Sequence, residues 1–482
     1  MNTLAIDQGT SSTRALIVSR SGEVKTLASM PHGQHYPRTG WVEHDPDELI
    51  GNLRACLNAA AGVSDLAAIG LDNQGESCLA WDARTGRAIS RVIVWQDSRT
   101  SADIERLRRE GVEAMVLERT GLPLDPYFSA SKFGWIMREI PEAKALAAAG
   151  QLRLGTTDAF FLDRLTGRFV TDVTTASRTS LIDLVTCQWD EELCALFGVP
   201  IDALPQIVPS TGDFGTLRVG EKYVPLAASI VDQQASLHGH GCRSAGDAKI
   251  TFGTGAFALA VTGALMRTNA GGPLPTVAWQ KSGEKPTFAL DGGVYSASSA
   301  VNWARGLGLF KEFSEIDAFD APAAIDRGIA FVPALAGLAC PHWDRAARGA
   351  WLGLSLDSSP ADMMQALLEG VALRMGEVVD AMQASQPLSS PVSIDGGMAA
   401  NTYFCQFLAD TLQRELIVSN QPELTAIGTA ELAAEAVGHP ISFQRGGHRI
   451  RPRARQAGRA ELFAAARQSV QAYGSFGKNI LT

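Results

Sequence analysis

Several features that mark other protein classes are scarce or absent in this sequence of 482 residues. Charged residues make up only 19%, and 42 basic residues stand against 51 acidic ones, for a net charge of -9. A general nucleic-acid binder needs a basic surface, so this balance argues against that class. Because hydrophobic residues reach 46%, a disordered chain is excluded as well, and a large buried core is expected.

Long apolar runs are also missing. The most apolar stretch, residues 329–340, contains Pro333 and Gly337 and is shorter than the ~20 residues that a membrane helix requires. The first 18 residues carry no basic leader, and Asp7 interrupts their apolar run, so no secretory signal is expected there. We therefore expect a cytoplasmic protein that has no membrane partner.

The seven cysteines are scattered, with no C-x-x-C motif and no Cys/His cluster at zinc spacing. We expect reduced thiols in the core, as is usual in a reducing compartment. His238 and His240 stand one residue apart, and on a strand they would share a face and could bind a metal, but no third ligand lies nearby. The P-loop pattern G-x-x-x-x-G-K-[ST] is absent too, so a phosphotransferase would belong to a different class.

Glycine, in contrast, is abundant, with 47 residues where the usual share is roughly 7%. Strand and helix patterns alternate along the chain, which predicts an α/β architecture. Residues 4–6 and 15–18 are predicted as two strands around a polar tip, and residues 248–252 and 257–261 repeat this arrangement around Gly253–Gly255. The repeat predicts two related domains, residues 1–244 and 245–482, that face each other across a cleft.

The tip of the first hairpin, residues 7–14, has the composition of a phosphate-binding turn. Glycine lets the backbone approach closely, and successive N–H groups and hydroxyls can donate to phosphate oxygens. Asp7 could hold a metal ion and Arg14 could reach a phosphate. The alternative is a polar hairpin tip with a capping Asp. Similarly, Gly396–Gly397 could let a flat base lie on the backbone, or could form an ordinary turn between a strand and a helix.

Gly253–Thr254–Gly255 also fits the start of a dinucleotide-binding fingerprint. That fingerprint needs a helix after the second glycine and an acidic residue about 20 positions further on. Residues 257–262 are predicted as a strand, and no Asp or Glu occurs between Ala256 and Gly283. The sequence therefore argues against an oxidoreductase of that type.

Three acidic residues follow predicted strands in the first half of the chain. Asp232 ends a strand and begins a probable helix, where a carboxylate could accept a proton from a hydroxyl. Asp72 and Glu76 follow another strand, and each of the three could instead be a cap or a surface acid. The arginines of residues 445–459 could form an anion patch, but we favour a solvated segment that leads into the last helix.

Several long segments, taken in order, resemble the FGGY family of carbohydrate kinases from end to end, and most closely its glycerol kinase branch. Residues 127–139 and 349–369 fit the family's two signatures in full. The matching segments are LAIDQGTSSTRALIV (4–18), GWVEHDP (40–46), VIVWQDSRT (92–100), GLPLDPYFSASKFGWIM (121–137), VDQQASLHG (231–239), KITFGTGAF (249–257), FVPALAGLACPHWD (331–344), RGAWLGLS (348–355), IDGGMAAN (394–401) and TAIGTAELA (425–433).

The resemblance implies the two-domain, actin-like (ribonuclease H-like) ATPase fold of the α/β class, with mixed central sheets flanked by helices and a cleft between the domains. It implies Mg²⁺-dependent transfer of the γ-phosphoryl group of ATP to a sugar or polyol hydroxyl, with glycerol to glycerol 3-phosphate as the leading expectation. The N-terminal domain would bind polyol and phosphate and carry the catalytic base, and the C-terminal domain would bind the nucleotide. A homo-oligomer, either a dimer or a tetramer, is expected.

The same likeness assigns roles to individual residues. Asp232 would be the general base, and Asp7 would serve the metal. The polyol would be held by residues that match the glycerol kinase pattern, namely Glu76, Trp95, Tyr127, Asp232, Gln233 and Phe257. The ATP site would include Thr10, Ser11, Arg14, Gly253, Thr254, Ser298, Asn302, Gly397 and Asn401.

Gly75 is the sharpest departure from the family pattern. Glycerol kinases have Asn-Gln-Arg-Glu where this chain has Asn-Gln-Gly-Glu at 73–76, and their arginine holds two substrate hydroxyls. Losing such a charge-assisted hydrogen bond costs ~1.5–3 kcal/mol. Either another group rescues glycerol binding, or a larger substrate such as a tetritol, a pentitol or a ketopentose (xylulose, for example) fills the space. Ser298 and Asn302 replace a Gly and a Gln that are usual near the nucleotide.

A catalytically silent regulator on the same fold, which binds a ligand without turning it over, is the remaining alternative. A silent relative has no chemical need for Asp7 or Asp232, and both residues are present. The sequence therefore favours an enzyme.

Overall fold

The computed structural model describes residues 1–268 and 271–481 of the chain. The chain folds into two compact units. The first unit comprises Met1–Gly241, Pro275–Ala289 and Glu423–Gln444, and the second comprises Cys242–Leu274, Leu290–Pro422 and Arg445–Thr482. The chain therefore passes between the units several times. The assignment of residues 1–244 and 245–482 to two domains with separate roles stays a prediction.

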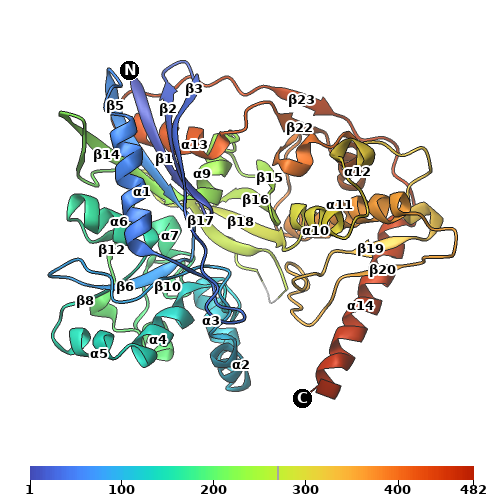
Figure 1. Cartoon of the computed structure of the whole chain (residues 1–482), viewed down its shortest axis with the longest axis horizontal. Helices are drawn as coiled ribbons and strands as arrows, with labels where there is room; N and C mark the ends of the chain where they lie inside the picture. The colour runs from blue at the N-terminus through green and yellow to red at the C-terminus, as the bar shows by residue number, and fades with distance from the viewer. Residues whose placement is uncertain (269–270, 482) are drawn as a thin grey trace. The chain divides into compact units, whose positions relative to one another are not determined.

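A six-stranded sheet with the order β13-β14-β5-β1-β2-β3 forms the centre of the first unit (Figure 1). β1 pairs antiparallel with β2, as predicted, and parallel with β5, which in turn pairs parallel with β14. Three neighbouring strands therefore end at the same edge of the sheet. The strands are β1 (Asn2–Gln8), β2 (Ser12–Ser19), β3 (Val24–Pro31), β5 (Leu66–Asn73), β13 (Thr216–Val219) and β14 (Lys222–Val231).

Helices cover both faces of this sheet, because alternate residues of a strand point to opposite sides. Leu4 of β1 belongs to the same apolar cluster as Leu53 of α1, whereas Leu16 of β2 clusters with Ala430 of α13. The helices of the first unit are α1 (Pro46–Ala59), α2 (Ser101–Arg109), α3 (Glu113–Thr120), α4 (Ser129–Glu139), α5 (Pro141–Ala148), α6 (Thr157–Thr166), α7 (Val173–Ala176), α8 (Glu191–Phe197), the 3₁₀ turn η1 (Ile201–Ala203), α9 (Asp232–Gly239) and α13 (Leu424–Ala436).

A smaller sheet with the order β4-β7-β6-β8 supports a separate apolar cluster in the first unit. Cys78 and Ala80 of β6 pack there with Phe133 of α4 and Leu193 of α8. This cluster anchors the loops that precede α4 and follow β6. The remaining strands of the first unit are β4 (Glu43–His44), β6 (Cys78–Asp82), β7 (Val92–Ile93), β8 (Leu152–Thr156), β9 (Val170–Asp172), β10 (Ile182–Asp183), β11 (Gln188–Trp189), β12 (Gln206–Val208) and β17 (Leu274–Trp279), the last from Pro275 on.

The sheet of the second unit repeats the arrangement of the first. β15 pairs antiparallel with β16 around the tip 253–255, and parallel with β21, so the predicted second hairpin is confirmed. β21 continues to β22 and β23, and β18 flanks β16 on the other side. The strands are β15 (Ala248–Phe252), β16 (Ala256–Gly263), β18 (Thr287–Val294), β19 (Ala330–Val332), β20 (Ala350–Leu352), β21 (Val392–Gly396), β22 (Leu416–Ser419) and β23 (Gly447–Ile450).

The long helix α11 packs at the centre of the second unit's apolar core. Ser359 and Asp362 form a capping box at its start, so the first turn has partners for its free N–H groups. From Met364 to Gly376 every residue of the helix is buried. The helices of this unit are α10 (Ser298–Gly306), η2 (Phe313–Ile316), η3 (Ile325–Arg327), α11 (Pro360–Ser385), η4 (Gly397–Ala400), α12 (Thr402–Leu412) and α14 (Arg459–Leu481).

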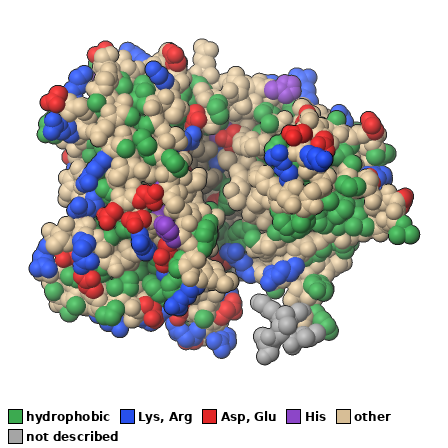
Figure 2. All heavy atoms as spheres, in the orientation of Figure 1, with side chains coloured by type: hydrophobic (Ala, Val, Ile, Leu, Met, Phe, Trp, Pro, Cys, Tyr) green, Lys and Arg blue, Asp and Glu red, His purple; other side chains and the backbone are tan. Residues whose placement is uncertain are grey.

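Among the described residues, no helix is both long enough and apolar enough to cross a membrane. Basic and acidic side chains are interspersed over the face drawn in Figure 2. All seven cysteines are buried and unbridged, as predicted, and burial raises the pKa of thiols such as Cys78 and Cys242 to about 12. These thiols are core residues.

Candidate active site

Three carboxylates meet where the parallel strands of the first unit end. Asp7 on β1 is the register partner of Asp72 on β5, and Asp232 follows Val231, the partner of Asn73. Asp72 is fully buried. Its burial, followed by the nearby charges of Asp7 and Asp232, raises the pKa of Asp72 well above its usual range. Its side chain accepts a 2.7 Å hydrogen bond from the Thr429 hydroxyl.

Arg14 links the first hairpin to Asp7. The antiparallel register places Arg14 opposite Asp7, and the guanidinium donates to the Asp7 carboxylate and approaches Glu423 Oε2 to 2.7 Å. Burial by itself lowers the pKa of Arg14, but the two carboxylates outweigh it and raise the pKa. Asp7 therefore lies beside a cation that Glu423 also holds in place.

The tip of the first hairpin combines a tight turn with a polar contact to an aromatic residue. Gly9 N donates to the Ser12 carbonyl at 3.0 Å, which closes the turn. The Thr10 hydroxyl accepts a 3.1 Å hydrogen bond from the Trp95 indole, and Ser11 is exposed. The tip therefore presents a short stretch of backbone and hydroxyls directly after the Asp7 carboxylate.

Asp232 begins α9, as predicted, and lies half-buried at its first position. Gln233 N donates to Asp232 Oδ1 at 2.6 Å, so the carboxylate lies against the positive end of the helix. α9 packs closely on α13, because a Cβ at Gly239 would come within 1.8 Å of the Leu424 carbonyl. This packing fixes the position of Asp232.

Glu76 lies in a strained loop that follows β5. Its side chain is buried, and its backbone has a left-handed φ of 58°, which costs a non-glycine residue of the order of 1 kcal/mol or more. The Ser129 hydroxyl donates to the Glu76 carbonyl at 2.9 Å, and Arg178 Nε donates to Glu76 Oε1 at 2.6 Å. The surrounding structure therefore holds this loop in place.

Two aromatic residues form a corner beside this loop. The rings of Trp95 and Tyr127 contact edge to face at 5.5 Å. Fully buried Lys132 donates to the Tyr127 carbonyl at 2.6 Å and approaches the Trp95 carbonyl to 3.5 Å. Burial lowers the pKa of Lys132, while the neighbouring Asp97, Glu76 and Asp125 carboxylates favour its charge.

In the second unit the Gly253–Gly255 tip joins the start of α10. Ala297 and Ser299 N–H groups donate to the Thr254 carbonyl, and Ser298 N donates to the Gly253 carbonyl at 3.1 Å. A Cβ at Gly255 would lie 2.9 Å from the Val294 carbonyl, so glycine is required there. Gly255 is followed by strand β16 and not by a helix, which excludes the dinucleotide fingerprint.

The glycine pair after β21 lies next to this tip. Gly396 has a φ of 92°, and a Cβ there would come within 2.3 Å of the Phe252 carbonyl. At Gly397 the nearest atom, Ser298 Oγ, would be 3.7 Å from a Cβ, and both glycines are exposed. Gly253, Ser298 and Gly397 are therefore brought together around an open stretch of backbone.

The other predicted residues of the second unit surround this region. Asn302 is exposed on α10, one turn beyond Ser298. Asn401 caps α12 by accepting from Phe404 N at 2.7 Å, and its amide donates to the Ile316 carbonyl at 2.7 Å. The side chain of Asn401 thus has a structural role. Phe257 is half-buried on β16.

The pair His238 and His240 forms no metal site. His238 lies on helix α9 and not on a strand, with Nδ1 3.2 Å from Glu431 Oε2. In the part of the chain that the structure describes, no three His, Cys, Asp or Glu side chains are placed to hold an ion.

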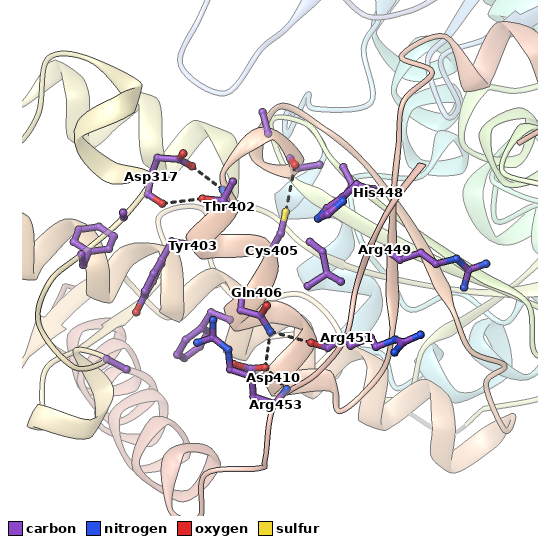
Figure 3. A pocket seen from close by; sticks show the side chains of 18 of the residues that line it. Asp317, Thr402, Tyr403, Cys405, Gln406, Asp410, His448, Arg449, Arg451 and Arg453 are labelled. Atoms are coloured by element: carbon purple, nitrogen blue, oxygen red, sulfur yellow. Dashed lines mark hydrogen bonds between the residues drawn. The ribbon is translucent and has the colours of Figure 1, made fainter. Parts of the chain in front are cut away.

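The arginine run lines a cavity of about 1190 Å³ along α12 (Figure 3). Its backbone faces α12, because Gln406 donates to the Arg451 carbonyl at 3.0 Å. The exposed side chains of Arg449 and Arg451 extend away from the helix, and Arg449 approaches Glu415 to 3.3 Å. This favours the solvated segment over an anion patch. The edge strand β23 within the run was not predicted.

Comparison of the chain with known protein families agrees with the site described above. The profile for the N-terminal domain of the FGGY family of carbohydrate kinases matches residues 2–239, and that for the C-terminal domain matches residues 248–437. The chain belongs to the FGGY family of carbohydrate kinases. It is 41% identical over 446 residues to the glycerol kinase of Gluconobacter oxydans, an alignment that covers 90% of this chain and 87% of that protein.

Solved structures of similar proteins confirm the predicted fold. The structure of Plasmodium falciparum glycerol kinase with ADP superposes with a TM-score of 0.89 at 29% identity over 98% of each chain. A xyloylose kinase from Brucella ovis superposes with a TM-score of 0.86 at 24% identity over the whole of both chains. At that level of identity the second likeness concerns the fold alone. The two-domain kinase fold with mixed sheets and flanking helices is therefore shown for this chain.

Two buried cations near the predicted site were missed from the sequence. Lys132 lies inside a segment that matches a family signature, so its position in that motif was an available signal. Arg178 lies 102 residues from Glu76 in the sequence, and nothing local to it indicated a partner.

Proposed function

We propose that this protein transfers the γ-phosphoryl group of ATP to a hydroxyl of a neutral polyol, with glycerol as the preferred substrate and glycerol 3-phosphate as the product. The observation that carries the proposal is the carboxylate at the end of β14, Asp232, next to Asp7 and the buried Asp72. Relatives named glycerol kinase, at about 41% identity, support the choice of glycerol.

In this proposal Asp232 is the general base. Its carboxylate accepts the proton of the attacking hydroxyl, the hydroxyl oxygen forms the bond to the γ-phosphorus, and ADP departs. The half-buried position at the start of α9 suits this role, because the carboxylate is partly desolvated and yet remains accessible to a substrate. Glu76, Trp95, Tyr127 and Gln233 would surround the polyol, and the family resemblance adds Phe257 to this set.

The nucleotide would be held mainly by backbone. Thr10, Ser11 and Arg14 of the first hairpin and Gly253 and Thr254 of the second offer donors for phosphates. Gly397, Ser298 and Asn302 surround an open patch on which a base could lie, and Asn401 would shape that patch through its cap of α12.

A magnesium ion fits Asp7. Mg²⁺ is usually held by one or two carboxylates together with waters and substrate phosphates. Asp7 supplies one carboxylate at the base of the proposed phosphate-binding tip. When bound, the ion would neutralise charge on the transferring phosphoryl group.

The buried carboxylate of Glu76 favours a neutral polyol over a sugar acid, because a second carboxylate would be repelled there. A larger polyol or ketopentose is the second candidate, since Gly75 replaces the arginine that glycerol kinases carry beside this glutamate. The higher identity to glycerol kinases favours glycerol. We also propose a cytoplasmic homo-oligomer, which light scattering of the purified protein would test.

An ADP-release assay over glycerol, tetritols, pentitols and ketopentoses tests the proposal. We expect the highest kcat/KM for glycerol. Asp232→Asn should lower kcat by roughly 10²–10⁴-fold, the usual contribution of a general base. ADP affinity measured by calorimetry should remain within about twofold of wild type.

Asp213→Asn is the control for removal of an acidic side chain, because Asp213 is exposed, where it pairs with surface Arg168 and accepts a hydrogen bond from Gly215 N at 2.8 Å. It should retain wild-type turnover. Full turnover by Asp232→Asn would refute the general-base role, and a pentulose with the highest kcat/KM would establish the second candidate.

A further inference from the structure

Glu76 belongs to a buried ion pair that no part of the proposed mechanism uses so far. Arg178 Nε donates to Glu76 Oε1 at 2.6 Å, and each side chain is 6% exposed. Removing one partner of such a pair leaves an uncompensated buried charge, which is strongly unfavourable. The pair therefore determines both the ionisation and the orientation of Glu76.

Both partners lie in loops whose backbone is unusual. Glu76 has a φ of 58°, and Ser180, two residues after Arg178, has a φ of 61°. Left-handed residues other than glycine cost free energy and persist where the surroundings enforce them. The Glu76 carbonyl is held by Ser129, and the Thr179 carbonyl accepts from Ala130 N at 2.8 Å. The start of α4 thus joins the two loops.

The Arg178 guanidinium also lies beside the aromatic corner. Its Cζ is 5.9 Å from the centre of the Tyr127 ring and 5.5 Å from that of Phe128. A planar guanidinium against aromatic rings is held in one orientation, which lysine does not reproduce. Arg178 therefore fixes Glu76 relative to Tyr127, the other predicted polyol-binding side chain.

We propose that Arg178 is the positioning residue for polyol specificity: it keeps Glu76 ionised and aimed at the substrate hydroxyls in a pocket where position 75 has no side chain. The inference rests on the proposed function and deepens it, because it assigns recognition of a neutral diol to a fixed carboxylate–guanidinium pair. Charged and titratable groups near Glu76 include Arg178 from the loop after α7 and Lys132 from α4, with Tyr127 beside Arg178 and with Asp97 and Asp125 around Lys132.

The kinetic test uses Arg178→Gln in the full chain. Without the guanidinium, the buried carboxylate of Glu76 takes up a proton more readily, and the neutral acid accepts a hydroxyl hydrogen bond more weakly than the carboxylate does. We expect the KM for the best polyol to rise by roughly 10–100-fold, which corresponds to one charge-assisted hydrogen bond. The variant's KM should fall again as the pH rises from 6 to 9, while the wild-type KM stays flat and the ATP KM is unchanged in both.

Three further variants separate positioning from simple stability. Arg178→Lys keeps a cation and should show a smaller rise in KM. The double variant Glu76→Gln with Arg178→Gln removes both charges and should regain melting temperature without regaining polyol affinity. Arg153→Gln removes a partly buried arginine that pairs with Asp163 elsewhere in the same unit. This variant should lower the melting temperature and leave the KM for the polyol unchanged.

A spectroscopic measurement decides the inference independently of turnover. Carbon-13 NMR of labelled glutamate carboxyls, with Glu76 assigned by its absence in Glu76→Gln, should show no titration of Glu76 between pH 6 and 9 in wild type. Arg178→Gln, or Arg178→Met if the first does not fold, should show titration in this range. If Glu76 behaves identically in wild type and variant, or if the KM rise is independent of pH, the positioning role is wrong. Failure of wild type to phosphorylate any polyol would overturn the proposed function, while the NMR result would still decide this inference.

Discussion

The two units use one arrangement of strands but end them with different chemistry. In each unit a hairpin, β1–β2 or β15–β16, has a parallel neighbour, β5 or β21. In the first unit these strand ends carry the buried carboxylates Asp7 and Asp72, whereas in the second unit the chain continues into Gly253 and ends at Gly396. The first edge, at Asp7 and Asp72, therefore depends on which carboxylates carry a proton and on their ion pairs. The second edge, at Gly253 and Gly396, depends on the space between neighbouring backbone segments.

This difference predicts how each edge responds to substitution. A change of charge should affect the first unit most, because its groups are buried and coupled to one another. A single added methyl should affect the second unit most, because its backbone segments approach too closely for a Cβ. Substitutions at both edges therefore test whether the comparison holds.

The largest effect is expected for Gly396→Ala in the second unit. The residue has a φ of 92°, and the added Cβ would lie 2.3 Å from the Phe252 carbonyl. A conformation of this kind costs a non-glycine residue about 1–3 kcal/mol, and the clash adds to it. We expect a loss of about 3 kcal/mol or more in the free energy of unfolding of this unit, measured by scanning calorimetry.

Gly397→Ala is the matched control for that substitution. Its Cβ would meet only Ser298 Oγ, at 3.7 Å, so stability should stay within about 0.5 kcal/mol of wild type. ADP affinity should nevertheless fall if the base lies on this backbone. Equal melting temperatures for the two alanine variants would remove the steric argument for the second edge.

An intermediate effect is expected for Gly75→Arg, a glycine at the charged edge. A Cβ added at position 75 would lie 3.2 Å from Val231 Cγ1, so Val231 must shift slightly. The new guanidinium would supply the missing hydrogen-bond donors beside Glu76. We expect the KM for glycerol to fall by roughly tenfold, or about 1.4 kcal/mol, in steady-state assays.

Gly75→Met provides a long side chain without the charge and should not improve glycerol binding. If Gly75→Arg instead impairs glycerol turnover while Gly75→Ala does not, a larger natural substrate occupies the space. That outcome would make Gly75 a specificity determinant and would weaken the division between a charged edge and a steric edge.

The hairpins, the helix start at Asp232 and the turn at Gly396–Gly397 could be predicted because local patterns determine them. Alternating apolar residues, a carboxylate after a strand and paired glycines each act within a few residues of the chain. The family resemblance then related these local features to one another and to a reaction.

Features that depend on distant contacts could not be predicted. Residues 423–444 follow the second sheet in sequence but belong to the first unit, where Thr429 reaches Asp72. The Arg178–Glu76 pair spans 102 positions, and burial, which the sequence does not show, makes it strong. Asp72 was left open as a cap or a surface acid, because its raised pKa results from burial and the charges around it.

The smallest effect is expected for Asp72→Asn, which tests whether every acid of the first edge carries charge. Because burial raises the pKa of folded Asp72, the folded protein keeps a proton that the unfolded chain has lost, and wild-type stability falls as the pH rises above the ordinary value of 3.8. Asparagine mimics the protonated form, so its advantage should be near zero close to pH 4 and grow toward neutral pH. We expect a gain of about 1 kcal/mol at pH 7, or roughly 2–4 °C in Tm, with turnover retained.

Asp82→Asn should show the opposite sign in the same pH series. Hydrogen bonds from the Arg84 N–H lower the pKa of Asp82, so its contribution to stability is present above the ordinary pKa and is lost as the pH falls below it. The asparagine variant should therefore melt below wild type at neutral pH, and the difference should shrink in acid. If Asp72→Asn also melts below wild type at pH 7, or loses turnover, then Asp72 is ionised in the native state, and the first edge is charged throughout.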